Sequence, residues 1–391
     1  MSTQKVLFLY ISISSGHQKA AEAMISAMRG LDSETEGLGM DLFTHAYPML
    51  GRVFAKAYLK MLEHAPQIWD YLYDNPDVEE ATREAREILN ILNARKIQRL
   101  LRQHRPKALV CTQASPASLI AAEKRKGRLD LPLIGVITDY GVHSYWLYEQ
   151  MDLYLVATED VKREIVSRGI PESRVRVTGI PIDPRFAERH NPAEERRRLR
   201  LDLRRPTALI MGGSQGLGPL PELVAALRDH PTSPQLIVVC GRNRKAYREL
   251  YKEYGQDPDV RLIGWAKNVP RLMDAADVLI SKPGGLTTSE ALAKGLPMII
   301  FRPIPGQEER NADYLLKNGV AERAGDLSEL DPIMEKIFSR PEQLKRMSEK
   351  ARSLGRPRAA WDAARYILGV VRRAHPSPVR SSRPAPWVVA R

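Results

Sequence analysis

"SKPGGLTTSEALAKGLPMII", residues 281–300, runs from the end of one apolar segment through a Pro-Gly-Gly turn into a helical pattern, and then into a second apolar segment. Thr287, Thr288 and Ser289 stand at the start of the helical pattern, where hydroxyl side chains can satisfy free backbone N–H groups. A strand, a tight turn, a helix and another strand, in this order, form the repeating unit of a parallel α/β sheet. We therefore expect a chain built from such units.

The same stretch has the chemistry of a nucleotide site. The backbone amides from Gly284 to Thr288 lie at a helix start, where free N–H groups and the helix dipole favour an anion such as a diphosphate. Glu290, one turn into the helix, can accept hydrogen bonds from both hydroxyls of a ribose. A glutamate near a helix start is also a common partner of the helix dipole, so this stretch alone leaves both roles open.

Short apolar runs alternate with helical patterns along most of the 391 residues. Such β-branched runs, without polar alternation, are typical of parallel strands covered on both faces. We predict strands at Val6–Ile13, Ala108–Thr112, Leu133–Thr138, Leu153–Ala157, Val175–Thr178, Thr207–Met211, Gln235–Cys240, Val260–Ile263, Val278–Ser281 and Met298–Phe301. We predict helices at His17–Arg29, Glu84–Gln103, Glu159–Arg168, Leu220–Asp229 and Thr287–Ala293. The alternation predicts an α/β fold with doubly wound sheets.

The length of the chain exceeds what one hydrophobic core usually supports, so we expect two domains. Three prolines in "TGIPIDPRFAERHNPAEE", residues 178–195, interrupt regular structure and place the boundary there. We predict a first domain at 1–180, a second at 181–355 and a terminal helix at 356–371. Residues 372–391 are rich in Pro, Ser and Arg and contain no acidic residue, a composition typical of disorder.

Each half opens with a strand followed by a glycine-containing turn. In the first half, "SISSGHQKAAEAM", residues 12–24, places Gly16 in the turn and His17 at the helix start. In the second half, the turn "GGSQG", residues 212–216, contains Gly212, Gly213, Ser214 and Gln215. Glycine lets a backbone approach a ligand closely, although tight turns need glycine anyway. Two such turns in two α/β halves favour a ligand between the domains.

Two further polar groups follow predicted strands, at the sheet edge where α/β folds bind ligands. "TDYGVHSYW", residues 138–146, brings Asp139 and His143, either of which can deprotonate a hydroxyl. An Asp and a His also commonly form a structural hydrogen bond. "RPIPGQEERNADYLL", residues 302–316, reads as a loop with amide and carboxylate groups suited to a sugar, or as a polar surface loop.

The formal net charge of +13 indicates an anionic partner: nucleic acid, an anionic membrane or a phosphorylated substrate. Aromatic residues for base stacking are lacking in the basic stretches outside Trp387, which disfavours nucleic acid, and solvated helix faces are the ordinary alternative. The segment Leu42–Tyr73 mixes aromatic, aliphatic and basic residues and fits either a pair of core helices or a surface that dips into a bilayer. Two cysteines in apolar runs and no apolar run of membrane-spanning length favour a cytoplasmic protein.

Taken in order, "SSGHQKAAEA", "TDYGVHSYW", "GIPIDPRF", "GGSQGLG", "SKPGGLTTSEALAKGLP" and "IPGQEERNADYL" resemble the motifs of the diacylglycerol glycosyltransferases. This family comprises plant-type monogalactosyldiacylglycerol synthases and bacterial processive diacylglycerol glucosyltransferases. The resemblance implies a GT-B fold, in which two Rossmann-like domains face a cleft. It implies inverting transfer of a hexose from UDP-glucose or UDP-galactose to diacylglycerol, without a cofactor or essential metal, by a peripheral protein on an anionic membrane surface at the inner face of the cell membrane.

The resemblance also implies roles for individual residues. His17, Asp139 and His143 would lie near the acceptor hydroxyl, with Gly16 allowing its approach. The donor groups would be Gly212, Gly213, Ser214, Gln215 and Asn243 at the nucleotide, Lys282, Gly284, Gly285, Thr287 and Thr288 at the diphosphate, Glu290 at the ribose, and Gln307, Glu308 and Asn311 at the sugar.

Three other functions fit parts of the pattern. The N-acetylglucosaminyl transferase that makes lipid II shares the glycine turn and a similar sugar loop, although "IPGQEERNADYL" and "TDYGVHSYW" argue against it. A UDP-N-acetylglucosamine 2-epimerase has the same two-domain form but needs no aromatic and basic segment. A non-catalytic sensor of sugar nucleotides would not be expected to keep His17, Asp139, Glu290 and Gln307 together.

Overall fold

A computed structural model describes residues 3–11, 15–42 and 96–373. Most of the segment Leu42–Tyr73, most of the predicted helix Glu84–Gln103 and nearly all of the predicted tail at 372–391 lie outside these residues. Within the described chain, residues 96–104 are helical. None of the helices in the described ranges is long and apolar enough to cross a membrane.

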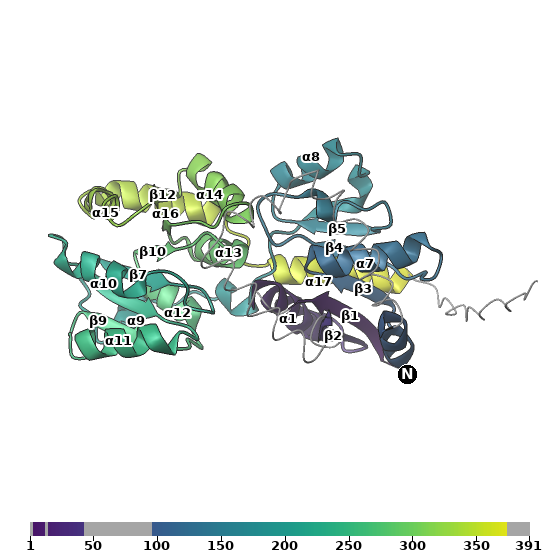
Figure 1. Cartoon of the computed structure of the whole chain (residues 1–391), viewed down its shortest axis with the longest axis horizontal. Helices are drawn as coiled ribbons and strands as arrows, with labels where there is room; N and C mark the ends of the chain where they lie inside the picture. The colour runs from purple at the N-terminus through teal and green to yellow at the C-terminus, as the bar shows by residue number, and fades with distance from the viewer. Residues whose placement is uncertain (1–2, 12–14, 43–95, 374–391) are drawn as a thin grey trace, which may run out of the picture.

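The first sheet has six parallel strands in the order β2-β1-β3-β4-β5-β6. Its strands are β1 (Gln4–Tyr10), β2 (Thr35–Asp41), β3 (Ala108–Cys111), β4 (Leu133–Val136), β5 (Leu153–Val156) and β6 (Val175–Val177). The helices of this part are α1 (Ser15–Leu31), α7 (Ala114–Arg125) and α8 (Glu159–Ser167), with short 3-10 turns at Ser144–Trp146 and Glu172–Arg174. The strands lie side by side between helices in Figure 1.

The second sheet also has six parallel strands, in the order β12-β11-β10-β7-β8-β9. Its strands are β7 (Thr207–Met211), β8 (Gln235–Val239), β9 (Val260–Ile263), β10 (Val278–Ser281), β11 (Met298–Phe301) and β12 (Ala321–Ala324). The helices are α9 (Pro192–Arg198), α10 (Leu220–Asp229), α11 (Arg244–Tyr254), α12 (Val269–Ala275), α13 (Gly285–Lys294), α14 (Gln307–Lys317), α15 (Leu330–Phe338) and α16 (Pro341–Leu354), after a 3-10 turn at Pro184–Ala187.

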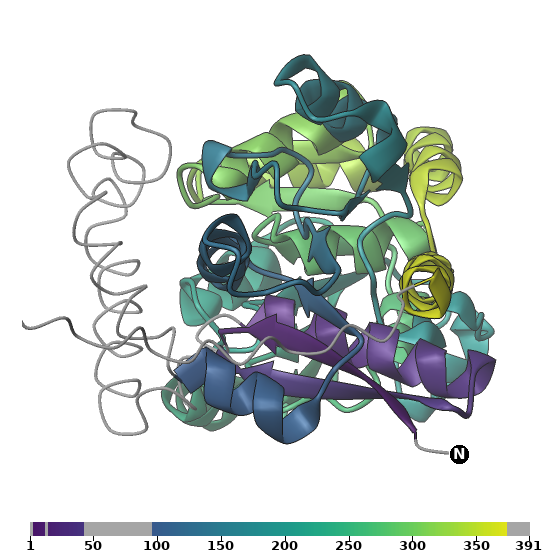
Figure 2. The ribbon, with the colours of Figure 1, turned by 90° about the vertical axis from the view of Figure 1, so that its right-hand side faces the viewer.

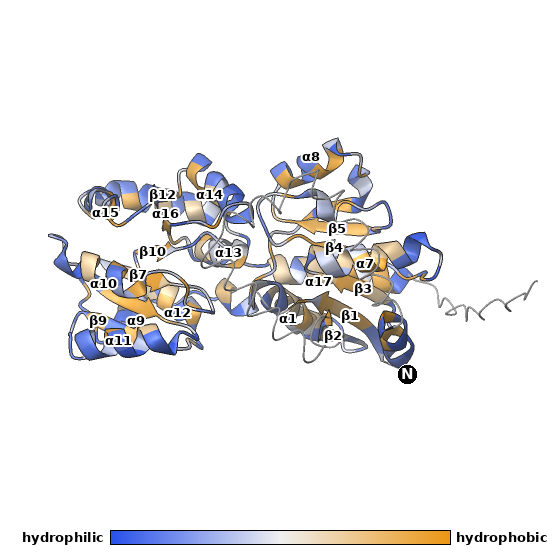
Figure 3. Cartoon of the chain, in the orientation of Figure 1, coloured by the Kyte–Doolittle hydropathy of each residue, from blue (hydrophilic) through white to orange (hydrophobic). Residues whose placement is uncertain are grey.

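Each sheet has an apolar core on both faces, because successive strand residues point to opposite sides. Along β1, Leu7 and Leu9 belong to the core on one face, whereas Val6 and Phe8 belong to the core on the other. In Figure 3 the strands are mainly hydrophobic and the outer faces of the helices are mainly hydrophilic. This two-sided burial explains why the strand sequences lack polar alternation.

The last helix returns to the first part of the molecule. Helix α17 (Ala359–Arg373) packs against α1, and Figure 2 shows α17 end-on beside it. Its buried residues, including Ala360, Ala363 and Ile367, share a core with Met24 of α1. Small alanine side chains let two helices approach closely, so α17 joins the end of the chain to its first domain.

All ten predicted strands occur, with ends that differ by a few residues at most. Two further strands, β2 and β12, were not predicted, and each is the outermost strand at one end of its sheet. The expectation of a loop at residues 302–316 was partly wrong, because helix α14 begins at Gln307. Gly306, with a φ of 90°, ends the loop, and the Glu308 carboxylate accepts a hydrogen bond from the Ile304 N–H at 2.7 Å and so caps the turn.

Candidate functional site

The strand orders determine where loops diverge. In the second sheet the order reverses between β7 and β10, and the turns after these strands begin at Gly212 and Lys282. In the first sheet the corresponding reversal lies between β1 and β3, where Thr112 donates a hydrogen bond to the His17 carbonyl at 2.9 Å. Ligands of doubly wound folds bind outside the carboxyl ends of strands at such reversals. Both glycine turns predicted from the sequence therefore lie at the carboxyl ends of the strands, the edge of each sheet where ligands of this fold class bind.

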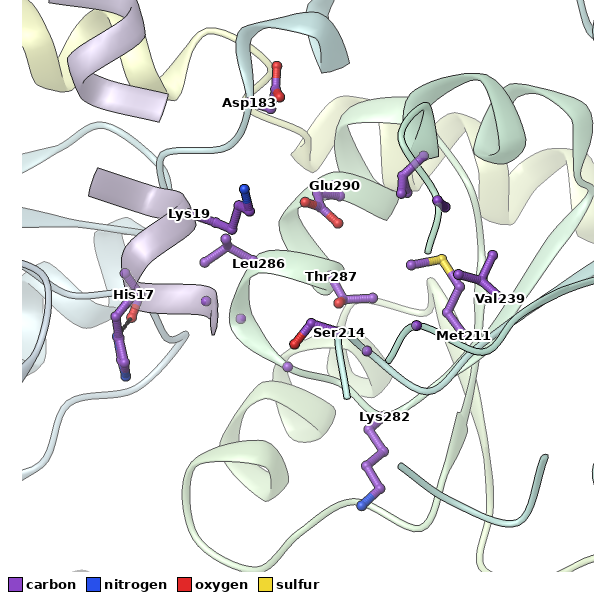
Figure 4. A pocket seen from close by; sticks show the side chains of 18 of the residues that line it. His17, Lys19, Asp183, Met211, Ser214, Val239, Lys282, Leu286, Thr287 and Glu290 are labelled. Atoms are coloured by element: carbon purple, nitrogen blue, oxygen red, sulfur yellow. Dashed lines mark hydrogen bonds between the residues drawn. The ribbon is translucent and has the colours of Figure 1, made fainter. Parts of the chain in front are cut away.

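These two edges face one another across a cavity of about 730 Å³. Its wall includes most of the predicted site residues: Gly16, His17, Asp139, Gly212, Gly213, Ser214, Gln215, Lys282, Gly284, Gly285, Thr287, Glu290, Gln307 and Glu308. Figure 4 shows residues of both domains converging on this space. A cavity of this size is in the range of small-molecule sites.

Glu290 of α13 lies opposite Lys19 of α1 and near Asp183 of the connection between the domains (Figure 4). Burial, together with the negative charge of Asp183, raises the pKa of Glu290 to about 8, and Lys19 opposes this shift. Lys19 also forms an ion pair with Glu22 at 2.7 Å. Glu290 is therefore mostly protonated near neutral pH.

The turn before α13 brings the two domains into direct contact. A Cβ atom built on Gly285 would lie 1.8 Å from the carbonyl oxygen of Thr138, a distance that no real side chain permits. Only glycine fits at this position, because the backbone of the first domain occupies the space. Gly284, one residue earlier, has no atom within 4 Å of its built Cβ.

The side chain of the acceptor-side candidate His17 contacts Thr138, which follows β4. Its Nδ1 lies 3.1 Å from the hydroxyl oxygen of Thr138. Burial lowers the pKa of His17 to about 4, although its interaction with Thr112 acts in the opposite direction. His17 is therefore a neutral imidazole near pH 7, able to exchange hydrogen bonds with a hydroxyl.

The Asp139 side chain accepts a hydrogen bond from a residue of the other domain. The side-chain amide of Asn311, on α14, donates a hydrogen bond to Asp139 Oδ1 at 3.1 Å, and its oxygen accepts from the Tyr140 N–H at 2.8 Å. Burial raises the pKa of Asp139 to about 6, while the Asn311 hydrogen bond and the charge of Arg310 lower it. A carboxyl group with this pKa can accept a proton near neutral pH.

Glu308 and Lys282 lie on the donor side of the cavity. Burial raises the pKa of Glu308 to about 7, opposed by its hydrogen bond from Ile304 and by the charge of Lys282. Gln307 stands beside Glu308 at the first turn of α14. The cavity therefore combines hydrogen-bonding groups for hydroxyls with a cation near the start of α13.

Four predicted residues lie outside the cavity wall. Asn243 caps α11, and its side-chain amide donates a hydrogen bond to the Gly216 carbonyl at 2.9 Å, so it stabilises the glycine turn. His143 contacts the rings of Tyr145 and Trp146. Thr288 is buried, and Asn311 is buried against Asp139 and Tyr140. Their predicted direct roles at the ligand stay predictions.

The cavity also contains residues that sequence reasoning missed, including Lys19, Glu22, Asp183 and Trp265. Asp183 lies within "GIPIDPRF", which was used only as a boundary and a family motif. Lys19 lies one helical turn after Gly16, on the same face, and this spacing was the available signal. In the described ranges, no group of three or more His, Cys, Asp and Glu side chains is arranged to hold a metal ion.

Comparison with known proteins bears on this geometry. The family model of monogalactosyldiacylglycerol (MGDG) synthase matches residues 17–182, and that of glycosyl transferases group 1 matches residues 194–354. A processive diacylglycerol beta-glucosyltransferase of Bacillus mycoides (strain KBAB4) is 30% identical over 366 residues, covering 93% of each chain. The chain belongs to the diacylglycerol glycosyltransferase family. A relative with the same description from Staphylococcus epidermidis (strain ATCC 12228) is 27% identical over 350 residues, covering 89% of this chain and 88% of the relative.

Solved structures agree on the architecture of this glycosyltransferase. The Acinetobacter baumannii MurG structure covers 94% of this chain and 99% of its own, with a TM-score of 0.62 and 15% identity. The UDP-GlcNAc 2-epimerase of Neisseria meningitidis, bound to UDP-GlcNAc, has a TM-score of 0.60 and 14% identity, covering 94% of this chain and 100% of its own. At these identities the likeness concerns the fold alone. The fold is GT-B, as predicted, with two Rossmann-like domains facing a cleft.

Proposed function

We propose that this glycosyltransferase moves a hexose from a UDP-sugar to the hydroxyl of diacylglycerol at a membrane surface, with inversion at the anomeric carbon. The observation that carries the proposal is the shared cavity, which has Glu290, Gln307 and Glu308 on one side and His17 and Asp139 on the other. The acceptor follows from the family, since the sequence relatives are described as acting on diacylglycerol.

The stereochemistry follows from the bond that the relatives are named for. They are described as beta-glucosyltransferases, whereas the glucose of UDP-glucose is joined through an α bond. Forming a β bond from an α-linked donor requires attack from the opposite face. A base on the acceptor side and a charge-stabilising group on the leaving-group side are then needed.

In the proposed reaction, the acceptor oxygen forms a bond to the anomeric carbon as the bond from that carbon to the diphosphate oxygen breaks. The proton of the acceptor hydroxyl passes to Asp139, and UDP departs with the bonding electrons. Asp139 suits this role better than His17, because its pKa of about 6 lies nearer to neutral pH than the value of about 4 for His17. His17 then orients the hydroxyl through a hydrogen bond.

The donor is held by the second domain in this proposal. Glu290 accepts the ribose hydroxyls, and Gln307 and Glu308 contact the sugar. Negative charge that develops on UDP is met by the backbone amides at the start of α13 and by Lys282. These groups supply the positive charge that the reaction needs, so the mechanism assigns no step to a metal or cofactor.

The test is incubation with UDP-glucose, UDP-galactose or UDP-GlcNAc and an equal mixture of diacylglycerol, ceramide and lipid II precursor in vesicles. We expect a hexosyl-diacylglycerol and UDP, identified by mass spectrometry, with a β-anomeric coupling by NMR. Glu290→Ala serves as a donor-site control and should lose most of the product. Transfer only to the lipid II precursor, or epimerised UDP-GlcNAc without a lipid product, would contradict the proposal.

A further inference from the structure

Asn311 is a polar side chain with no exposed surface, and it joins the two domains. It belongs to α14 of the second domain, whereas both of its partners, Asp139 and Tyr140, follow β4 of the first. Burying an amide is unfavourable unless its donor and acceptor are both used. Here both ends are engaged across the domain boundary, so the contact is specific in position and in direction.

The partners determine how the amide is oriented. The Tyr140 backbone N–H can only donate, so the oxygen of Asn311 must face it at 2.8 Å. The amide nitrogen then faces Asp139 Oδ1 at 3.1 Å, as a donor. Among the described residues, the structure gives Asp139 Oδ2 no hydrogen bond, so this second oxygen is available for a substrate proton.

Neighbouring contacts hold the same loop on the second domain. The side chain of Arg310 packs on Gly141 and donates to the Val142 carbonyl. The Tyr140 hydroxyl lies 2.9 Å from Ser289 Oγ of α13, and the Tyr140 ring stacks on Tyr314 at 4.3 Å between centroids. The loop that carries Asp139 is therefore in contact with α13 and α14 of the second domain at several residues.

We propose that Asn311 is a positioning residue that holds the Asp139 carboxylate ionised and aimed for proton transfer, and that it does so only when the two domains are docked. This inference rests on the proposed function, in which Asp139 takes the acceptor proton. It differs from the sugar contact that the sequence suggested for Asn311, because the amide oxygen and nitrogen both face partners in the first domain and Asn311 is buried outside the cavity wall. The donor domain thus activates the base of the acceptor domain.

Several charged or titratable groups surround Asp139. From α14, Arg310 lowers the pKa of Asp139, and Glu308 couples to it as a like charge. Tyr140 is its neighbour in the loop, and His17 of α1 is linked to the adjacent Thr138. Among the influences that lower the pKa of Asp139, the hydrogen bond from Asn311 is the largest. Losing that bond therefore moves the pKa upward from about 6.

The experiment compares the pH dependence of kcat for the wild type and Asn311→Asp, with UDP-glucose and diacylglycerol vesicles. The substitution keeps an acceptor for Tyr140 N–H but replaces the donor to Asp139 with a like-charged or proton-sharing group. We expect the acidic limb of the profile of kcat against pH to move to higher pH by about one unit. Turnover should fall about fivefold at pH 6 and recover near pH 9, with the KM for UDP-glucose within about twofold of wild type.

Tyr140→Phe is the matched control, because it removes the bond to Ser289 while keeping the ring stack and the Asn311 contacts. It should leave the acidic limb in place. In an Asp139→Asn background, Asn311→Asp should cause little further loss of turnover, as expected for a residue that acts through Asp139. Asn311→Ala, which adds no charge, repeats the test and should shift the limb in the same direction.

An unmoved acidic limb in folded Asn311 variants would overturn the inference, and so would a raised KM for UDP-glucose with an unmoved limb, which would make Asn311 a sugar contact. A ¹³C carboxyl titration of Asp139, assigned by its loss in Asp139→Asn, gives a readout that needs no turnover. We expect a higher pKa in Asn311→Ala than in wild type, and equal values would overturn the inference. A wild type that makes no glycolipid contradicts only the proposed function.

Discussion

At the scale of single residues, Glu290 occupies an unusual electrostatic position. It belongs to the donor domain, but the charges that act on it come from Lys19 of α1 and from Asp183 between the domains. Its place after the Pro-Gly-Gly turn left a ribose role and a helix-dipole role open, and the family resemblance implied the ribose role. No sequence pattern could predict the two partners, because Lys19 lies 271 positions away (290 minus 19) and only folding brings it near.

This environment makes the binding of UDP-glucose pH-dependent. With a pKa of about 8, Glu290 is mostly protonated at pH 6 and accepts ribose hydroxyls poorly. Raising the pH from 6 to 8 raises its ionised fraction from about 1% to about 50%, so we expect affinity for UDP-glucose to rise by up to about fiftyfold over this range. Calorimetry measures it, and the diphosphate of UDP-glucose does not titrate in this interval.

Glu290→Gln should bind more weakly at pH 8 and lose most of this pH dependence. The difference between the variant and wild type separates Glu290 from Glu308 and Asp139, which also line the cavity. Glu309→Gln, a surface carboxyl paired with Arg323, is the control and should behave as wild type. A pH dependence that survives in Glu290→Gln would assign the titration to another group.

At the scale of elements, burial on both faces decided what the sequence could predict. All ten predicted strands are rich in apolar side chains. Of the edge strands of the two described sheets, β6 (VRV) and β9 (VRLI) were predicted because most of their residues are apolar. The two that were missed are more polar: β2 has the sequence TEGLGMD, and β12 has AERA. Edge strands keep polar residues on their exposed side, so their sequences resemble loops. Helix α14 was predicted as a loop because its first turn is polar and follows two prolines.

The start of α13 gives a test of how tightly the two domains must dock. Gly285→Ala would place a Cβ 1.8 Å from the Thr138 carbonyl oxygen, so the loop carrying Asp139 must move away. We expect faster hydrogen exchange in residues 139–143 and a loss of about 1–3 kcal/mol in unfolding free energy, the usual range for overpacking.

Gly284→Ala is the matched control, because its added Cβ meets no atom within 4 Å and its φ of −63° suits alanine. Its hydrogen exchange and unfolding should match the wild type. Hydrogen exchange and unfolding are measured instead of activity, because both glycines line the proposed donor site and either substitution can change donor binding directly. Equal exchange in the two variants would show that the contact seen at Gly285 does not hold the domains together.

At the scale of the whole molecule, the cavity that contains the candidate site and some of the basic residues lie at opposite edges of the first sheet. The cavity lies at the carboxyl ends of the strands, between the domains. Arg105 stands before β3, and Arg125 and Lys126 stand before β4, so they lie at the amino edge of the first sheet. Figure 1 shows that edge, beside the N-terminus, on the side away from the second domain. The basic charge read from the sequence is therefore not all near the cavity.

A protein that takes its acceptor from a bilayer must turn the mouth of its cavity toward the lipid. Charges at the opposite edge are then separated from the anionic surface by the thickness of the domain, whereas screening limits attraction to about 8–10 Å at physiological salt. We expect the triple variant Arg105→Gln, Arg125→Gln and Lys126→Gln to sediment with anionic vesicles within about twofold of wild type, although it loses three exposed charges. Product formation should also be unchanged. A large loss of vesicle binding in this variant would instead place the amino edge against the membrane and would require the acceptor to reach the cavity by another route.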